Sequence, residues 1–319
     1  GAGPGPLRVA LLGYRSKPHA GGQGVYLRYL SRALVEQGHT VDVISGPPYP
    51  ELDDRVGLIR IPSLDLYERG LRSLRLRHLR SLSNIVEWTS KLTGGFAEPY
   101  TFGRRVCRYL RRHAADYDIL HDNQSLSYGM LRLQQRGLPL VTTIHHPITR
   151  DRAIALAHAR GRGERFLVRR WYSFLRMQLR VAPRLKHVIT VSERARIDIA
   201  EAFGRGPETI DVIHNGIDTE LFRPLPSIPR ELRLLVATAS ADAPLKGLEV
   251  LLGAVAELRA RYPELTLVVV GRPRAGGATE RALDRLRLRD CVQFQANLTT
   301  PELVTLYARA TVAVVPSLY

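Results

Sequence analysis

The 319-residue sequence has only two cysteines, Cys107 and Cys291, which lie far apart and lack the spacing of a metal site. This scarcity argues against a disulfide framework and favours two free thiols in a reducing compartment. No apolar run approaches the ~18 residues that a membrane span requires, and no signal peptide opens the sequence. We therefore expect a cytoplasmic protein.

Acidic residues are also scarce, because 30 Asp and Glu face 47 Lys and Arg, which gives a formal net charge of +17. Such an excess favours anionic partners, namely phosphates, nucleic acid or an acidic membrane surface. The sequence has no recognised nucleic-acid-binding module, so we expect no nucleic-acid partner. It has no convincing Asp-x-Asp or histidine cluster, and Asp53 and Asp54 are adjacent residues of a predicted loop.

Short β-branched runs alternate with helical patterns along almost the whole sequence, which predicts parallel βαβ units and doubly wound α/β sheets. The length favours two domains, and the proline-containing segment 217–231 reads as a linker. We expect domains at 1–216 and 217–319 that face a cleft, the second with about four strands and no closing helix. The expected strands are 7–14, 40–46, 56–63, 117–123, 138–146, 187–193, 209–216, 232–240, 265–271, 291–297 and 311–317.

A glycine-rich bend, "HAGGQGVY", precedes the first predicted helix. Without side chains, Gly21 and Gly22 would let their N–H groups approach a phosphate or sugar at the helix N-terminus. A tight strand-to-helix turn without a ligand is the alternative. A dinucleotide fingerprint is disfavoured, because the bend lacks the G-x-G-x-x-G spacing and "YRSKPHA" separates it from the strand.

Several short motifs occur in a fixed order: "VSE", "NGID", "FRP", "LKG", "LVVVG", "ELVTLYARA" and "VVPS". In that order they resemble glycosyltransferase family 4, whose members have two Rossmann-like domains in the GT-B arrangement. The resemblance implies a retaining transfer of a sugar from a nucleoside-diphosphate donor to a hydroxyl acceptor. It also implies an N-terminal acceptor domain, a C-terminal donor domain, no metal and no other cofactor.

The family normally continues beyond "VVPSLY" with "EGFG" and a Glu-x7-Glu motif that holds the donor. Because this sequence ends before that motif, the resemblance implies a shortened, catalytically incomplete C-terminal domain. A nucleotide-sugar epimerase of the same fold and a non-catalytic nucleotide-sugar-binding protein remain alternatives.

Lys246 precedes Gly247 at the start of a predicted helix, where a cation would neutralise a bound diphosphate. The resemblance assigns the donor diphosphate to Lys246 and places Gly271 and Arg272 at the same site. The family's usual arginine six residues before this lysine is replaced here by Ser240. Arg272 or Arg274 would supply the missing charge, or the diphosphate is held differently.

His145 ends the predicted strand 138–146, and the resemblance assigns it a role near the transferred sugar. His146 is the competing candidate. "HNGID" reads as the interdomain hinge, with Asn215 and Gly216 at a tight or left-handed turn.

Two basic stretches, 68–82 and 161–180, interleave arginines with leucines and aromatic residues. As amphipathic helices they would suit an anionic membrane surface and a lipid-linked acceptor. Ordinary solvated helix faces are the alternative. On the first reading the protein would be peripheral at the inner face of the membrane.

Overall fold

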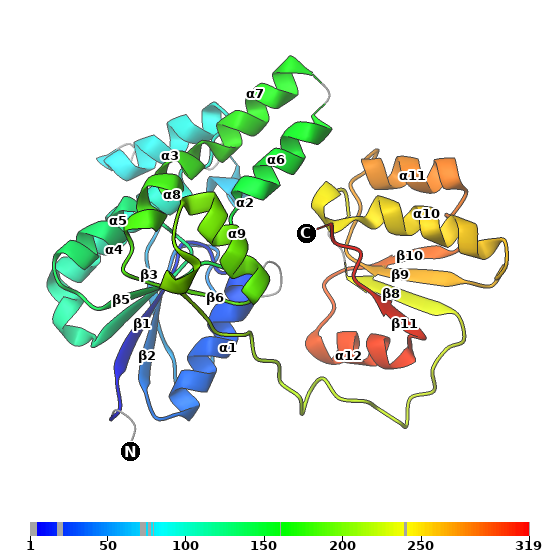
Figure 1. Cartoon of the computed structure of the whole chain (residues 1–319), viewed down its shortest axis with the longest axis horizontal. Helices are drawn as coiled ribbons and strands as arrows, with labels where there is room; N and C mark the ends of the chain where they lie inside the picture. Colours follow the sequence, from blue (N-terminus) through cyan, green and yellow to red (C-terminus); the bar gives the residue numbers. More distant parts are fainter. Residues whose placement is uncertain are drawn as a thin grey trace. The chain divides into compact units, whose positions relative to one another are not determined.

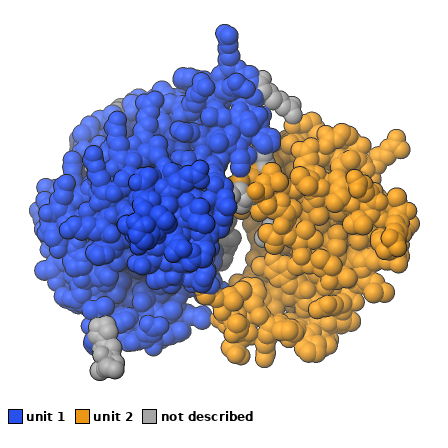
Figure 2. All heavy atoms as spheres, viewed as in Figure 1, with its two compact units in different colours: residues 1–215 blue, residues 216–319 orange. Residues whose placement is uncertain are grey.

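The computed structural model describes residues 5–17, 22–70, 75, 78, 80–159, 161–238 and 241–318. The chain forms two compact units, residues 1–215 and 216–319, which Figure 2 distinguishes by colour. The sequence analysis placed the division one residue later, after Gly216.

Unit 1 contains a seven-stranded sheet in the order β3-β2-β1-β4-β5-β6-β7, in which every neighbouring pair is parallel (Figure 1). Each strand lies within a predicted strand but is shorter. The strands are β1 (Arg8–Gly13), β2 (Thr40–Ser45), β3 (Gly57–Arg60), β4 (Ile119–Asn123), β5 (Leu140–Thr143), β6 (His187–Thr190) and β7 (Ile210–Val212).

The strand predicted to run to residue 146 is wrong in its length, because β5 ends at Thr143. Ile144 still donates its N–H to Ile189, at 2.9 Å. The N–H of His145 instead donates to the side chain of Gln124, at 2.7 Å. His145 therefore lies in the loop after the strand.

Both faces of this sheet are covered by helices. Successive residues of β1 point to opposite faces: Ala10 and Leu12 join one buried cluster, Val9 and Leu11 another. Alternation with both faces buried explains why the strands read as continuous apolar runs. The helices are α1 (Gly22–Glu36), α2 (Leu66–Arg69), α3 (Leu82–Leu92), α4 (Glu98–His113), α5 (Tyr128–Gln135), α6 (Thr149–His158), α7 (Arg162–Trp171), α8 (Leu175–Val181) and α9 (Glu193–Phe203).

Unit 2 contains a four-stranded parallel sheet in the order β10-β9-β8-β11. Helices α10 and α11 lie on one face of the sheet and α12 on the other (Figure 1). The described part of this unit is therefore doubly wound as well. Its elements are β8 (Leu234–Thr238), α10 (Leu248–Arg259), β9 (Thr266–Val270), α11 (Ala278–Leu286), β10 (Val292–Gln295), α12 (Thr300–Arg309) and β11 (Val312–Val314).

The two basic stretches have different outcomes. Most of 71–79 lies outside the described residues, so the helix predicted over 68–82 is not described as a whole. The helix predicted over 161–180 is divided into α7, a 3-10 turn (Tyr172–Phe174) and α8. Helix α7 has no buried residue, whereas α8 buries Leu175 and Met177.

Candidate functional site

Each sheet has one place where the strand order reverses direction. In unit 1 the reversal lies at β1: β2 and β3 extend the sheet on one side of β1, and β4 to β7 extend it on the other. In unit 2 the reversal lies between β8 and β11. Open parallel sheets bind ligands beyond the carboxyl ends of the strands at such a point. The predicted sugar-binding and donor-binding residues that the structure describes follow the carboxyl ends of strands at or next to these two places, whereas the predicted hinge follows β7 at the edge of the sheet.

A cluster of residues around His145, with Asn123, Gln23 and Tyr26, lies at the reversal point of unit 1 and is called the histidine cluster. His145 Nε2 is 2.7 Å from Asn123 Oδ1, and the Asn123 amide donates to the carbonyl of Gln23, at 3.1 Å. The Tyr26 ring meets the His145 ring edge-on, with centroids 4.7 Å apart. The end of β4, the loop after β5 and the first turns of α1 thus bring these side chains together.

The hydrogen bonds determine the tautomer of neutral His145. Because the Asn123 amide nitrogen donates to Gln23, its Oδ1 faces His145 as an acceptor, so Nε2 carries the proton. Nδ1 then keeps its lone pair and can accept a hydrogen bond. Burial lowers the pKa of His145 to about 4, and the neighbouring His146 and His121 add to this effect. His145 is therefore uncharged at neutral pH.

His146, the competing candidate, has a different environment. Its side chain is 40% exposed and lies 3.5 Å from Asp151. Its carbonyl accepts a hydrogen bond from the Gln124 amide, at 2.8 Å. The geometry therefore favours His145 as the residue built into the cluster.

The loop after β4, which contacts the histidine cluster, has an uncommon backbone conformation. Gln124 and Leu126 have positive φ angles of 55° and 46°, a conformation that costs non-glycine residues free energy and is concentrated at functional sites. The carboxylate of buried Asp122 accepts the N–H groups of Ser125, at 3.3 Å, and Leu126, at 3.2 Å. Burial nevertheless raises the pKa of Asp122 to about 6.

The glycine bend is described only in part, because Gly21 lies outside the described residues. Gly22 begins α1 and has no atom within 4 Å of the position that a Cβ would occupy. A Cβ on Gly24, by contrast, would overlap the backbone of Lys17. Gly24 is thus required for packing, whereas Gly22 leaves open space at the start of the helix.

In unit 2, Lys246 lies at the start of α10, beyond the carboxyl end of β8. It ends a 3-10 turn (Pro244–Lys246), and Gly247 follows as the N-cap with a φ of 63°. The carbonyl of Pro316, in the segment after β11, would overlap a Cβ on Gly247. This contact places Lys246 at the reversal point between β8 and β11.

Asp242 joins the loops after β8 and β9. Its carboxylate accepts the N–H groups of Arg274, at 2.7 Å, and Thr279, at 2.8 Å. Burial opposes ionisation, but these hydrogen bonds outweigh it and hold the pKa of Asp242 below its usual value. Ser240 lies outside the described residues.

The remaining predicted donor residues are in the loop after β9. Gly271 donates its N–H to Gln295, at 2.8 Å, and Arg272 is exposed beside it. The segment predicted as a hinge has irregular backbone, and Asn215 and Gly216 are both exposed there. Of the two conformations expected at Gly216, tight or left-handed, the left-handed one is wrong, because its φ is not positive.

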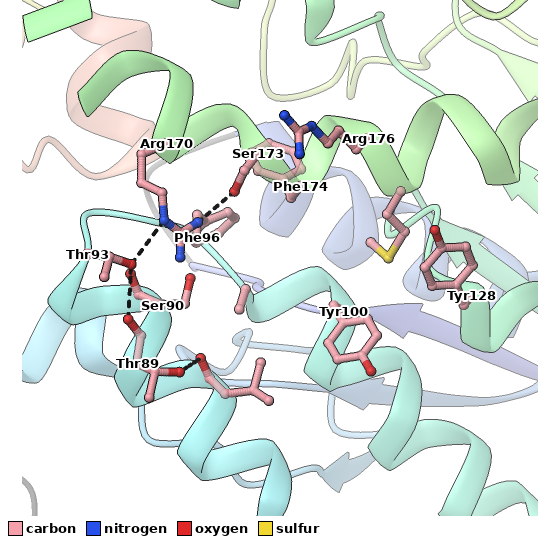
Figure 3. A pocket seen from close by; sticks show the side chains of 13 residues that line it. Thr89, Ser90, Thr93, Phe96, Tyr100, Tyr128, Arg170, Ser173, Phe174 and Arg176 are labelled. Atoms are coloured by element: carbon pink, nitrogen blue, oxygen red, sulfur yellow. Dashed lines mark hydrogen bonds between the residues drawn. The ribbon is translucent and has the colours of Figure 1, made fainter. Parts of the chain in front are cut away.

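A cavity of about 500 Å³ opens in unit 1 among α3, α4 and α8 (Figure 3). Figure 3 shows Arg170 donating to Thr93, at 2.9 Å, and to Ser173, at 2.8 Å. Phe96 and Phe174 meet edge-to-face, with centroids 5.5 Å apart. The lining residues are Val86, Thr89, Ser90, Thr93, Phe96, Ala97, Tyr100, Tyr128, Arg170, Ser173, Phe174, Arg176 and Met177.

A chain of contacts connects this cavity to the histidine cluster. Phe96 packs edge-on against Tyr14, with centroids 6.2 Å apart, and Tyr14 hydrogen-bonds the side chain of Gln23. Asn123 bonds the carbonyl of Gln23 and the ring of His145. The cavity therefore belongs to the same side of unit 1 as the cluster.

No group of three His, Cys, Asp or Glu side chains in the part of the chain that the structure describes is arranged to hold a metal ion. No helix within the same residues is long and apolar enough to cross a membrane.

Sequence reasoning missed Asn123, Gln124, Tyr26 and Asp242. Asn123 had a visible signal, since it is a polar residue at the carboxyl end of a predicted strand. The other three act through contacts between separate loops, which a single sequence does not reveal.

Comparisons with known proteins agree with this architecture. The family model described as Glycosyltransferase Family 4 matches residues 20–221, and the model described as Glycosyl transferases group 1 matches residues 233–319. The chain is 47% identical to the MMP alpha-(1->4)-mannosyltransferase of Mycolicibacterium hassiacum, over 98% of this chain and 76% of that protein. It is 28% identical to the D-inositol 3-phosphate glycosyltransferase 2 of Catenulispora acidiphila, over 98% of this chain and 74% of that protein.

Solved structures with low sequence identity share the fold. Sucrose-phosphate synthase of Thermosynechococcus elongatus aligns with a TM-score of 0.66 at 21% identity, over 98% of this chain and 76% of that one. WaaG, a glycosyltransferase involved in lipopolysaccharide biosynthesis, aligns with a TM-score of 0.65 at 18% identity, over 97% of this chain and 75% of that one.

Proposed function

Given that the chain belongs to glycosyltransferase family 4 and has the GT-B fold, we propose that it transfers a mannosyl residue from a nucleoside-diphosphate donor to a saccharide hydroxyl. The observation that carries this proposal is the 47% identity, over 98% of this chain, to a protein named as an alpha-(1->4)-mannosyltransferase. By that likeness, the acceptor hydroxyl is O4 of a sugar and the new bond is α. With a donor whose sugar is α-linked to diphosphate, the transfer retains configuration.

Unit 2 carries the donor in this proposal. Breaking the bond between the sugar C1 and the diphosphate builds negative charge on the leaving group, and fixed cations and N–H groups lower the energy of that state. Lys246, together with the N-terminus of α10, supports such a role by its position beyond the end of β8. Arg272 and Arg274, both exposed in the loop after β9, would compensate for Ser240.

Unit 1 carries the acceptor in this proposal, and His145 contacts a sugar hydroxyl. Neutral His145 would accept a hydrogen bond from a sugar hydroxyl at Nδ1, since Nε2–H is committed to Asn123. The aromatic and hydroxyl groups of the 500 Å³ cavity suit the alternating apolar and polar faces of a saccharide. His145 would act as a neutral hydrogen-bonding group, because its lowered pKa keeps it from being charged.

A thermal-shift titration tests the donor site. UDP-, GDP- and ADP-mannose would be compared, and ligand at a hundredfold excess over its Kd stabilises the folded protein by about 2.7 kcal/mol. K246A should abolish the shift given by the best donor. The exposed Lys186 provides a matched control, and K186A should keep the shift. A shift that survives K246A unchanged would refute the placement of the diphosphate.

Product analysis distinguishes the alternatives. A mannose-containing oligosaccharide and the best donor should yield an α-(1→4)-linked product, identified by NMR. Epimerised donor without transfer would indicate the epimerase, and donor binding without either product would indicate the binding protein. EDTA should leave the transfer rate unchanged, as we propose that no metal takes part.

We further propose that α7 lies against an anionic membrane at the inner face, near a membrane-proximal acceptor. Phe166 and Leu167 of α7 are 62% and 55% exposed, and they alternate with Arg162, Arg165 and Arg169 on the same helix. Exposed apolar groups among arginines are typical of interfacial helices. The double variant F166S/L167S should lose sedimentation with vesicles of phosphatidylglycerol, whereas binding of wild type equally to neutral vesicles would contradict the proposal.

A further inference from the structure

Five arginines gather around one hollow on the outside of unit 1. The hollow has a volume of about 350 Å³ and lies between α4 and α5. No acidic residue lines it. Its lining residues are Arg104, Cys107, Arg108, Arg111, Arg132, Gln135 and Arg136.

The sequence places these arginines on facing helix surfaces. Arg104, Arg108 and Arg111 follow the i, i+4, i+7 spacing of one face of α4, and Arg132 and Arg136 follow the i, i+4 spacing at the end of α5. The absence of a side chain on Gly129 lets the two helices approach closely, since a Cβ there would overlap the backbone of Gly103. This glycine contact brings the two basic stripes to opposite walls of one hollow.

The five guanidinium groups have no acidic partner among the residues that the structure describes. Several arginines elsewhere in unit 1 do have an acidic partner, as Arg8 has Asp118 at 3.0 Å and Arg55 has Asp53 at 2.8 Å. Arg104 donates to the hydroxyl of Tyr100, at 3.5 Å, and its guanidinium lies 6.0 Å from the centre of that ring. Five like charges around one hollow repel one another, and an anion between them would remove that repulsion.

We propose that this arginine hollow is a binding site for a phosphate-bearing anion, separate from the proposed donor site. A guanidinium group binds two oxygens of a phosphate through two parallel hydrogen bonds. Several arginines in one hollow therefore favour a ligand that offers several pairs of phosphate oxygens. The volume lies in the range of small-molecule sites. A soluble phosphorylated compound and an anionic lipid headgroup share this chemistry.

Cys107 provides a local reporter of occupancy. Its thiol is half-buried in the lining of the hollow and donates to the carbonyl of Gly129, at 3.1 Å. The other cysteine, Cys291, is only 3% exposed and serves as an internal reference. Alkylation of Cys107 by iodoacetamide, followed by peptide mass spectrometry, would therefore report on ligand in the hollow.

The experiment uses inorganic pyrophosphate as the probe, in a K246A background so that the proposed donor site does not contribute. Pyrophosphate should slow alkylation of Cys107, and R108Q/R132Q should weaken its binding in calorimetry by at least about tenfold. Both substituted side chains are exposed, so the variant should fold. R162Q/R165Q, which removes the same charge from α7, should bind pyrophosphate like its parent.

Vesicles of phosphatidylglycerol distinguish the two sources of phosphate. Protection of Cys107 by pyrophosphate identifies a soluble ligand. Protection by vesicles alone, lost in R108Q/R132Q but kept in R28Q/R230Q, identifies a lipid headgroup; Arg28 and Arg230 are exposed and lie outside both the lining of the hollow and α7. If neither probe protects Cys107, or if protection is the same in R108Q/R132Q, the proposal is wrong.

Discussion

Replacing His145 by glutamine tests whether the histidine cluster keeps this ring uncharged. The glutamine amide can still donate to Asn123 Oδ1, the acceptor that His145 Nε2 uses at 2.7 Å. The variant loses the edge-on contact with Tyr26, an aromatic pair whose value is about 0.5–1.5 kcal/mol at every pH. The pH-dependent part of the stability difference therefore reports the ionisation of His145.

The sign and size follow from the lowered pKa. The folded state holds His145 at a pKa of about 4, while an unfolded histidine titrates near 6.5. As pH falls below 6.5, His145 of the unfolded chain binds a proton, whereas His145 of the folded protein stays neutral. The free energy of unfolding of wild type therefore decreases until about pH 4. Linkage gives a loss of about 2 kcal/mol between pH 7.5 and pH 5 from this residue. H145Q lacks the loss, so its stability relative to wild type should rise by that amount.

Urea unfolding followed by tryptophan fluorescence measures this difference. Both tryptophans, Trp88 and Trp171, lie in unit 1, so the signal reports the unit that contains His145. Comparing the two proteins at each pH cancels the contributions of other groups. A stability difference that is the same at pH 7.5 and pH 5 would show that His145 titrates normally, and the cluster would then lose its proposed role.

Two further predictions concern stability. G247A should destabilise unit 2 by about 1–3 kcal/mol in calorimetry, because the φ of Gly247 is 63° and a Cβ there would overlap Pro316. The control G253A, which has open space around this position of α10, should leave stability unchanged or raise it by up to about 1 kcal/mol. Equal melting temperatures of the two variants would contradict this prediction. Burial raises the pKa of Glu98 to about 7. Wild type therefore loses stability as pH rises from 4.5 through 7, because the folded state disfavours the ionised carboxylate. The stability of E98Q relative to wild type should rise by about 2 kcal/mol between pH 5 and pH 8. A relative stability of E98Q that does not change with pH would refute the raised pKa.

Periodicity predicted the parallel strands of both units, because strands buried on both faces leave continuous apolar runs such as "LRVALLGY". It did not predict where β5 ends, since that depends on the side chain of Gln124, which is 21 positions away from His145 in sequence. The 161–180 stretch was predicted as one amphipathic helix, yet it is divided, and the apolar Phe166 and Leu167 of α7 are exposed. Helix α8 buries Leu175 in the core, and a pattern of leucines and arginines looks the same in both cases.

The motifs located Lys246 and His145 in sequence but not their surroundings. Asn123 and Asp242 each join separate loops, and such partners become visible only when the chain is folded. Gly24 was not singled out, although its contact with Lys17 shows that it is the packing glycine of the bend.

The carboxamide of Gln124 holds the main chain at both ends of the His145–His146 pair: its oxygen accepts the N–H of His145 and its nitrogen donates to the carbonyl of His146. Both attachments are to main chain, so they do not depend on which side chain occupies position 145. The proposed contact of residue 145 with the sugar can therefore be varied by randomising this position while Gln124 is kept fixed, and the loop should retain its course.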